Sequence, residues 1–530
     1  MDVTIQFCGA ARTVTGLSLL FRTPTARVLV DCGMFQGPKT LKALNWEPFP
    51  YDPATLDAVL LTHAHIDHSG LIPKLALAGF RGPVHATRPT IDLCSCMLPD
   101  SGHVQEAEVQ QFNRRNRARH RDEVRPIYTA EDAVRALRIF RPVALDHWVE
   151  VADGVRARWW NAGHMLGSTS IELAFENGTE RPLRVLVSGD LGPDASALHR
   201  DPEGPEGLDH IIMESTYGDE DRPATSPAER RARLAALVRE AADPQGVLLI
   251  PAFAVERTQE ICWDLVALME SGQVPHAPIA VDSPLAIRAT EMFLRHAETL
   301  EEGKSLRRAL RSPLIRFTES VEESRSIGQT EGFHIVIAGS GMCDAGRIRH
   351  HLKRWLWSEH ATVLLSGYQA EGTLGRLLRD GRREVRIQGE TIAVAARIRQ
   401  IADFSGHADA PELARWLAAR GQVAGGIFLV HGEKEAMDGF AQRLARDGLA
   451  KTGQVLSPKL DDVFSLQPGI APKPQPSPRR RADPENLGRP DWHNARAALL
   501  LAIEGAIETA PDEAARQALI ARLRRALDGV

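Results

Sequence analysis

Short hydrophobic runs, each followed at once by polar residues, recur along the N-terminal part of the chain. They include Arg27–Asp31 (RVLVD), Ala58–Thr62 (AVLLT), Arg184–Ser188 (RVLVS) and His210–Met213 (HIIM). Runs of this length and composition predict buried β-strands. Polar residues at the carboxyl ends of strands are where ligand sites gather in layered α/β proteins. The pattern therefore predicts an α/β fold with a site built at strand ends.

The middle of the chain alternates helical and strand patterns. A helix is predicted over Pro227–Ala242, a buried strand over Gly246–Ile250 and a second helix over Phe253–Ser271. Further buried strands are predicted at Pro278–Asp282, His334–Ala338 and Thr362–Ser366. Apolar strands alternating with helices indicate a mostly parallel sheet covered on both faces. We predict a separate α/β domain here.

After this domain the pattern returns to strands that end in polar turns. Arg399–Phe404 leads into Ser405–Asp409, and Ile427–Val430 leads into His431–Glu433. If these strands rejoin the first domain, the middle domain is an insertion. The boundaries predicted on this basis are 1–204 and 396–466 for the two parts of the outer domain and 205–395 for the insertion.

The C-terminal part has a different composition. Residues 467–490 are rich in proline and contain Arg479–Arg481, which predicts a semi-extended linker. Residues 491–530 carry apolar residues at helical spacing on both sides of Pro511, which predicts a helical hairpin. We expect the hairpin to pack on the body or on a second subunit, as a homodimer contact through the C-terminal region; a partner-docking tail is the alternative.

Bulk composition narrows the class of protein. The 530 residues are enough for two or more domains, and 43% hydrophobic with 25% charged residues is the balance of a globular protein. No apolar run is long enough to span a bilayer, and the N-terminus MDVTIQFCGA lacks a signal-peptide pattern. The six cysteines form no CxxC pair and are expected to be reduced. We therefore predict a cytoplasmic protein with no membrane partner.

The net charge of −5 argues against a protein coated with positive charge, although a local basic groove stays open. The densest basic run either lines an entry path for a nucleic acid or is a solvated helix face; its members are Arg114, Arg115, Arg117, Arg119 and Arg121.

The stretch LTHAHIDHSG, residues 61–70, carries the strongest chemical signal. In an extended chain His63 and His65 project to the same side and can hold one metal ion. Asp67 and His68 come where the chain enters a helix and can hold a second ion nearby. Imidazole nitrogens and carboxylate oxygens suit Zn²⁺. This spacing directly after an apolar strand is far more specific than a lone histidine.

Three further residues stand in the same context, after strands or in glycine-flanked turns. They are His164 in NAGHMLGST, Asp190 after RVLVSG and His431 after IFLV. Asp190 can bridge two ions because a carboxylate has two oxygens. Each residue alone has an ordinary structural explanation, but together they complete a site for two metals.

These motifs resemble those of the metallo-β-lactamase superfamily, with Asp31 as its first motif. Within it the chain is similar to the β-CASP nucleases, whose motifs A, B and C match Glu214, His407 and His431. GSGMCDAGR (339–347) and YQAEGTLGR (368–376) are similar to stretches in the catalytic subunit of the cleavage and polyadenylation specificity factor and its prokaryotic relatives. The resemblance covers about residues 1–466.

The resemblance implies an αββα sandwich with an inserted β-CASP domain, to which the sequence adds the C-terminal hairpin. It also implies two Zn²⁺ per chain and an Asp31 that does not bind metal but orients a ligand histidine. The first zinc would be held by His63, His65, His164 and Asp190, and the second by Asp67, His68, Asp190 and His431.

The activity implied is hydrolysis of phosphodiester bonds in single-stranded RNA, with endonucleolytic cleavage in RNA processing or decay. Two zinc ions can lower the pKa of a shared water toward about 7 and supply hydroxide. The family assigns proton donation to His407, with Glu214 as its partner and Asp67 among the catalytic residues. Glycine-rich turns suit phosphates, and the expected substrate-binding residues are Arg257, Ser340, Gly341 and Arg347.

Other functions compete with this one. A DNA-directed β-CASP nuclease is barely separable by sequence. A small-molecule hydrolase is disfavoured by the inserted domain, Glu214, His407 and His431. An inactive scaffold is disfavoured by the intact ligand set. GSGMCDAG is no dinucleotide fingerprint, because Asp344 stands at the third glycine position.

Overall fold

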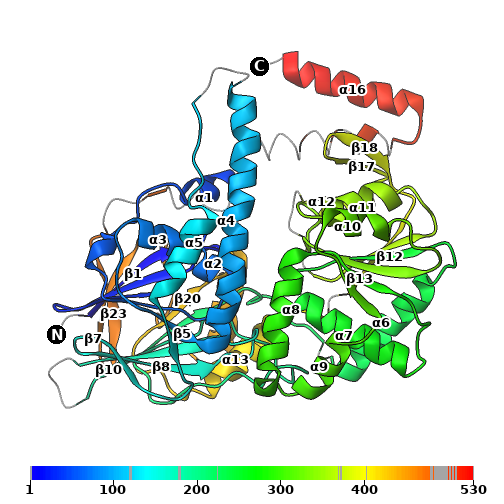
Figure 1. Cartoon of the computed structure of the whole chain (residues 1–530). Coiled ribbons are helices and arrows are strands. Elements are labelled where there is room, and N and C mark those ends of the chain that lie inside the picture. Colours follow the sequence, from blue (N-terminus) through cyan, green and yellow to red (C-terminus); the bar gives the residue numbers. More distant parts are fainter. Residues whose placement is uncertain are drawn as a thin grey trace.

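The computed structural model describes residues 3–117, 122–176, 181–223, 225–367, 369, 373–401, 403–477, 481–482, 499, 503, 506–507 and 510–528. Two lobes lie side by side in Figure 1, one blue, cyan and orange, the other green, and the long helix α4 (Arg88–Arg117) stands at their junction. Helices α4 and α8 (Pro284–His296) pack against each other across it. None of the helices in the described residues has the length and apolarity needed to cross a membrane.

The first lobe contains two sheets packed face to face. The eight-stranded sheet runs in the order β23-β22-β1-β2-β3-β4-β5-β6. Its strands are β1 (Val3–Gly9), β2 (Ser18–Arg22), β3 (Arg27–Val30), β4 (Ala58–Leu60), β5 (Val84–Thr87), β6 (Phe140–Val143), β22 (Val463–Gln467) and β23 (Ile470–Gln475). The seven-stranded sheet runs in the order β21-β20-β11-β10-β9-β8-β7. Its strands are β7 (Val149–Ala152), β8 (Val155–Asn161), β9 (Thr169–Phe175), β10 (Leu183–Val187), β11 (His210–Glu214), β20 (Ile427–Val430) and β21 (Val455–Leu456).

Alternating apolar residues of the two sheets form the core between them. Phe7 of one sheet contacts Phe428 of the other at 5.1 Å between ring centroids, and both rings are fully buried. Burial of such a side chain stabilises the fold by about 1.5–3 kcal/mol. Helices cover the outer faces: α1 (Lys39–Ala43), α2 (Ile66–Ser69), α3 (Ile72–Leu77), α4 and α5 (Ala130–Ala136) accompany one sheet, and α13 (Ala410–Ala418) and α14 (Lys434–Arg446) the other. The layered αββα fold is thus confirmed.

The second lobe is built on a parallel sheet of six strands in the order β14-β13-β15-β12-β16-β19. They are β12 (Val247–Pro251), β13 (Ile279–Val281), β14 (Ile315–Phe317), β15 (His334–Ala338), β16 (Ala361–Leu365) and β19 (Arg397–Gln400), beside a hairpin of β17 (Glu384–Ile387) and β18 (Glu390–Ala393). The helices are α6 (Pro227–Ala241), α7 (Arg257–Glu270), α8, α9 (Gly303–Leu310), α10 (Val321–Ile327), α11 (Ile348–Trp355) and α12 (Leu374–Arg379). The predicted inserted α/β domain is present.

The structure moves the predicted boundaries of the insertion. β11 follows the boundary at 205, yet it pairs with β10 and β20 in the seven-stranded sheet. β19 follows the boundary at 396, yet it pairs with β16 in the parallel sheet. β11 is as apolar as the inner strands of either sheet, and β19, with the sequence RIRQ, is a half-buried edge strand, so the pattern alone could not assign them.

The predicted linker 467–490 is also wrong in its first part. β23 adds an edge strand to the eight-stranded sheet through antiparallel pairing with β22. Its prolines are tolerated because an edge strand leaves one side of its backbone unpaired. Arg481 is an anchor, since its guanidinium contacts Asp461 at 2.8 Å and the carbonyl of Cys8. Much of the predicted hairpin lies outside the described residues; its second arm is helix α16 (Glu513–Asp528).

Candidate metal centre

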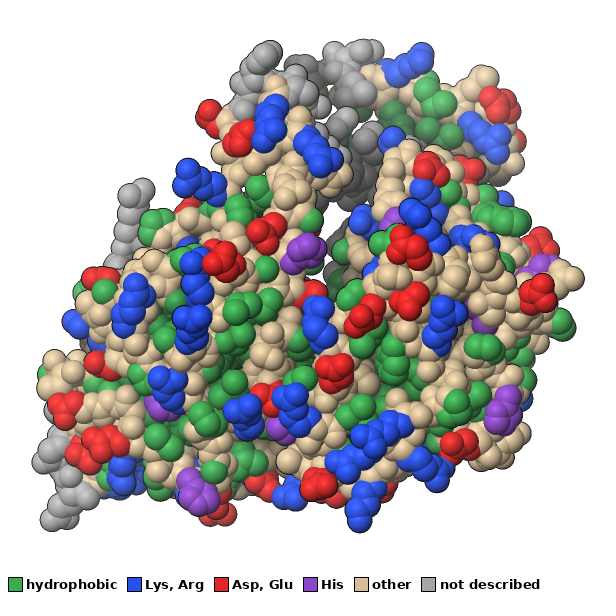
Figure 2. All heavy atoms as spheres, viewed as in Figure 1, with side chains coloured by type: hydrophobic (Ala, Val, Ile, Leu, Met, Phe, Trp, Pro, Cys, Tyr) green, Lys and Arg blue, Asp and Glu red, His purple; other side chains and the backbone are tan. Residues whose placement is uncertain are grey.

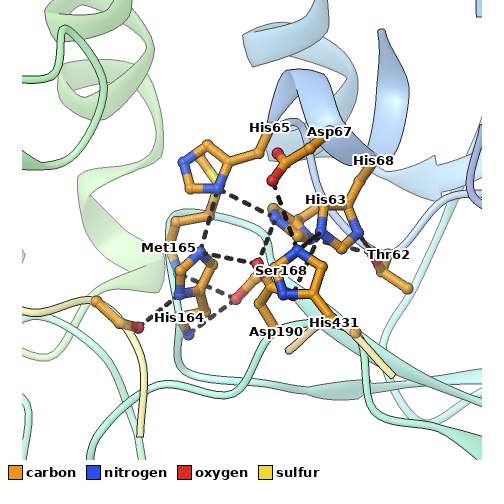
Figure 3. Close-up of polar contacts among 12 residues, drawn as sticks. Thr62, His63, His65, Asp67, His68, His164, Met165, Ser168, Asp190 and His431 are labelled. Atoms are coloured by element: carbon orange, nitrogen blue, oxygen red, sulfur yellow. Dashed lines mark hydrogen bonds and ion pairs between the residues drawn. The ribbon is translucent and has the colours of Figure 1, made fainter. Parts of the chain in front are cut away.

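The predicted metal ligands come together at the carboxyl ends of strands of the first lobe. The segment after β4 carries His63, His65, Asp67 and His68. The other three follow β8, β10 and β20, and are His164, Asp190 and His431. Figure 3 shows their side chains pointing toward a common centre, with Asp190 between the others.

Local backbone contacts fix the segment that carries the ligand cluster. The chain after β3 pairs with it, as Cys32 N–H donates to the His68 carbonyl at 2.7 Å and Met34 N–H to that of Ile66 at 2.9 Å. A Cβ on Gly33 would lie 1.7 Å from the Asp67 carbonyl oxygen, so only glycine fits there. Asp31 and His431 adopt left-handed φ angles of 59° and 48°. Non-glycine residues held in this way are characteristic of functional sites.

One ligand set consists of three histidine nitrogens and an oxygen of Asp190. His65 Nδ1 lies 3.1 Å from His63 Nε2 and 3.2 Å from His164 Nε2. Asp190 Oδ2 lies 3.5 Å from His63 Nε2 and 3.7 Å from His164 Nε2. All four atoms therefore surround one point.

A second ligand set adjoins the first and shares Asp190. His68 Nε2 lies 3.3 Å from His431 Nε2 and 3.2 Å from Asp190 Oδ1. Asp67 Oδ2 lies 3.5 Å from His431 Nε2. The two oxygens of Asp190 thus face one set each, which is the arrangement of a bridging carboxylate.

These spacings fit metal ions at both points. Ligands about 2.05 Å from a tetrahedral Zn²⁺ lie about 3.3 Å from one another, close to the separations observed. Asp190 Oδ1 is buried, and among the described residues it has no hydrogen bond of good geometry; its nearest polar neighbours are His68 Nε2 at 3.2 Å and His431 Nδ1 at 3.6 Å. A buried carboxylate oxygen without a donor is costly, and a cation would satisfy it.

The outer ring nitrogens of the ligand histidines are held by the protein. His68 Nδ1 donates to Asp31 at 2.7 Å, and His164 Nδ1 donates to the Gly406 carbonyl at 2.5 Å. Thr62 Oγ1 lies 3.0 Å from His63 Nδ1 and donates to Asp31 at 2.8 Å, so it can accept the proton of His63. With Nδ1 protonated, each Nε2 keeps a lone pair for the metal.

The electrostatics also favour metal binding. Burial lowers the pKa of His65 to about 4 and places those of His63 and His164 below their ordinary values, so the three rings are neutral. Burial opposes ionisation of Asp67, but the hydrogen bond from His431 lowers its pKa to about 2. Burial disfavours the charged form of His68, yet Asp190 and Asp31 raise its pKa well above the usual value.

Glu214 and His407 lie beside the centre. Glu214 is fully buried at the end of β11; its Oε1 accepts from Leu191 N–H at 2.6 Å and lies 3.2 Å from His407 Nδ1. Burial disfavours a charged His407, but the charge of Glu214 and its hydrogen bond, together with the charges of Asp190 and Asp67, outweigh it and raise the pKa of His407. The imidazole of His407 thereby lies next to both ligand sets, with its charged form favoured.

The four predicted substrate-binding residues belong to the second lobe. Arg257 pairs with Glu260 at 3.2 Å, and Arg347 donates to Asp282 at 2.7 Å and to the Thr318 carbonyl at 3.2 Å. Their guanidinium groups are thus bound inside the protein. Ser340 and Gly341 form the turn after β15, and a Cβ on Gly341 would lie 3.2 Å from the half-exposed ring of Phe253.

Two other sequence features singled out above lie only partly within the described residues. Arg114 and Arg117 are exposed at the end of α4; the side chain of Arg115 and residues 118–121 lie outside the described part, as do 368 and 370–372 of the YQAEGTLGR stretch. Basic and acidic side chains are interspersed over both lobes in Figure 2.

Sequence reasoning missed Thr62 and Thr216, whose hydroxyls contact the outer nitrogens of His63 and His431 at 3.0 and 3.1 Å. Their positions directly after β4 and in MESTYG were the available signal.

Comparison with known families identifies three matching regions. Residues 11–233 match the metallo-beta-lactamase superfamily, residues 258–378 the Beta-Casp domain, and residues 391–454 the Zn-dependent metallo-hydrolase RNA specificity domain. The matches are consistent with the order of elements in the two lobes.

Individual relatives extend over most of the chain. Ribonuclease TTHA0252 of Thermus thermophilus is 36% identical over 458 residues, covering 84% of this chain and 98% of the relative. Transcription termination factor FttA of Methanocaldococcus jannaschii is 30% identical over 464 residues, covering 84% of this chain and 69% of the factor. A protein of unknown function from Enterococcus faecalis V583 shares the fold with a TM-score of 0.51 at 12% identity, over 88% of this chain and 100% of that one.

Proposed function

The chain belongs to the β-CASP branch of the metallo-β-lactamase superfamily and is a metal-dependent hydrolase, and we propose that it is a zinc ribonuclease that hydrolyses phosphodiester bonds of single-stranded RNA. The observation that carries the proposal is the pair of ligand sets that share Asp190, with Glu214 and His407 beside them. The ribonuclease named among the relatives supports RNA as the substrate.

Zinc at such a centre supplies a nucleophilic hydroxide at neutral pH and positive charge for the phosphate oxygens. His63, His65, His164 and Asp190 would hold one ion. Asp67, His68, His431 and Asp190 would hold the other. Asp31 and Thr62 orient His68 and His63 through the hydrogen bonds described above.

His407 donates a proton from its free ring nitrogen to the departing ribose oxygen. Glu214 fixes the ring through Nδ1 and favours its charged form. Positioned proton transfer of this kind contributes about 10²–10⁴ to a rate.

The turn at Ser340 and Gly341 is the proposed contact for the RNA backbone. Arg257 and Arg347 would act on the substrate side through the loops that they hold, because their own guanidinium groups already have partners. Endonucleolytic action, a cytoplasmic location and a homodimer contact through the C-terminal region belong to the proposal as predictions.

The test uses 5′-labelled single-stranded RNA and DNA of the same sequence, incubated with the wild type and with Asp67→Ala. We expect internal cleavage of RNA by the wild type only. Asp438→Ala is the matched control, since Asp438 makes an exposed pair with Lys434 on α14 and should leave cleavage unchanged. Cleavage of DNA alone would favour a DNA nuclease, and cleavage of neither polymer would reject the proposal.

A further inference from the structure

The segment that follows Glu214 packs against the loop that carries His407. Tyr217 forms a β-bridge with Asp409, and Arg222 N–H donates to the Asp409 carboxylate at 2.9 Å. Ala410 N–H donates to the Glu220 carbonyl at 3.0 Å. These contacts join two stretches far apart in the sequence beside the metal centre.

The side chain of Arg222 reaches the backbone of His407 itself. Its guanidinium lies over the ring of Tyr217, 4.6 Å from the centroid, and donates to the His407 carbonyl oxygen. Among the described residues of its own loop, that carbonyl has only a long contact, 3.4 Å from Ser405 Oγ. Arg222 therefore makes the stronger contact of the two.

The imidazole ring of His407 is surrounded by the rings of three other residues. Its centroid lies 4.5 Å from that of His164 and 6.1 Å from that of His431, so it stands between a ligand of each set. On another side it meets the ring of Tyr217 at 6.0 Å with an angle of 75°. Tyr217 is thus held between the guanidinium of Arg222 and the imidazole of His407.

We propose that Arg222, acting with Tyr217, is a positioning residue that holds His407 in the place from which it protonates the leaving oxygen. This inference rests on the proposed function. A placement error of about 1 Å can cost a reaction roughly 10²-fold, so loss of Arg222 should impair the step that needs His407. Metal binding does not depend on the contact between Arg222 and His407, and neither does hydrolysis of a substrate whose leaving group needs no proton.

The test compares two substrates that differ in leaving group. Single-stranded RNA releases a ribose alkoxide that must be protonated, whereas bis(p-nitrophenyl) phosphate releases a phenolate that leaves without a proton. For Arg222→Ala we expect kcat on RNA to fall by about 10–100-fold, with KM for RNA, zinc content and kcat on bis(p-nitrophenyl) phosphate each within about twofold. Arg222→Lys, which can still donate to the carbonyl, should lose less.

Arg415→Ala is the matched control. Arg415 lies on α13 in the same region but pairs with Asp194 at the surface, so its loss should change neither substrate. An equal fall on both substrates would show a merely structural role for Arg222, and a raised KM with normal kcat would make it an RNA ligand; either result overturns the inference.

The proposed function is tested separately by the wild type and His407→Ala. A wild type that hydrolyses bis(p-nitrophenyl) phosphate but not RNA would overturn the proposed function and this inference together. If His407→Ala shows the leaving-group split and Arg222→Ala behaves as wild type, only the inference fails.

Discussion

The histidines of the centre differ in the partner of their outer ring nitrogen, and that partner determines what each can do. His68 and His164 donate to an aspartate and to a carbonyl, which leaves a lone pair for a metal. His407 faces the carboxylate of Glu214 from the edge of the centre, which favours a charged ring that can give up a proton. In the proposed function, histidine would thus serve as ligand or as acid according to its neighbours.

Replacement of His407 tests that division. His407→Ala should reduce RNA cleavage by about 10²–10⁴-fold, the usual contribution of general acid catalysis, while zinc content stays near that of the wild type. Zinc measured by mass spectrometry alongside the cleavage rate gives both quantities. His431→Ala is the comparison, because it should lose metal as well as activity. A loss of zinc in His407→Ala would mean that the two roles are exchanged.

Sequence alone could predict the ligand residues because they follow apolar strands at spacings that only a few structures use. It could not predict contacts that depend on distant chain segments. The bond from Arg222 to the carbonyl of His407 spans 185 positions, and the acidic partner of Arg347 lies in another loop. An arginine in the sequence gives no indication of whether its charge is free or already paired.

At the scale of elements, two strands near the predicted domain boundaries belong to a different lobe than predicted. β11 joins the outer sandwich and β19 joins the inserted sheet. A short apolar run such as β11 has the same pattern in either sheet, because the inner strands of both are buried on two faces. β19 is a half-buried edge strand with two arginines, and its sequence favours neither sheet. β11 was predictable as a strand, and the predicted strand Arg399–Phe404 only overlaps β19; the sheet that each strand joins was not predictable, since partner choice is fixed by tertiary packing.

One buried pair ties the β12–α7 loop to the first lobe. His199 Nε2 lies 2.6 Å from one oxygen of Glu256. The other oxygen accepts from the N–H of Leu166, two residues after His164. Burial disfavours a charged His199, but Glu256 raises its pKa above the usual value of about 6.5. A raised folded-state pKa gives stability that is complete below about pH 6.5 and is lost as the pH rises through the folded-state pKa.

His199→Gln should therefore lower the free energy of unfolding by about 1.5–3 kcal/mol at pH 6, the range for a hydrogen bond to a charged group, and by less at high pH. Urea unfolding across the pH range measures the difference. His360→Gln is the matched control, because its pair with Asp243 is half-exposed and should contribute little. A difference for His199→Gln that stays constant from pH 5 to 9 would contradict this account.

At the scale of the whole molecule, the body formed by the two lobes ends near Arg481. The alignment with the Thermus ribonuclease covers 98% of that protein but 84% of this chain. The side chain of Arg481 is 12% exposed, and it pairs with the fully buried Asp461. β23 forms the edge of the eight-stranded sheet, and the ion pair between Arg481 and Asp461 anchors the chain shortly after it.

Truncation tests where that body ends. A chain that stops after Ala482 should retain RNA cleavage and stability, whereas one that stops after Gly469 loses β23 and Arg481. The shorter chain leaves Asp461 as a buried unpaired charge, which costs about 3–5 kcal/mol. Arg481→Ala in the full chain should reproduce much of that loss. Equal stability of the two truncated chains would show that the anchor contributes nothing.

The central claim is that two zinc ions held on the two sides of Asp190 carry out the cleavage of RNA. Its most direct test is to strip the protein with a chelator, add zinc back in steps and follow cleavage of labelled single-stranded RNA. Activity should be absent without metal and reach its plateau at about two equivalents per chain. Full activity in the metal-free protein, or a plateau at one equivalent, would contradict the claim.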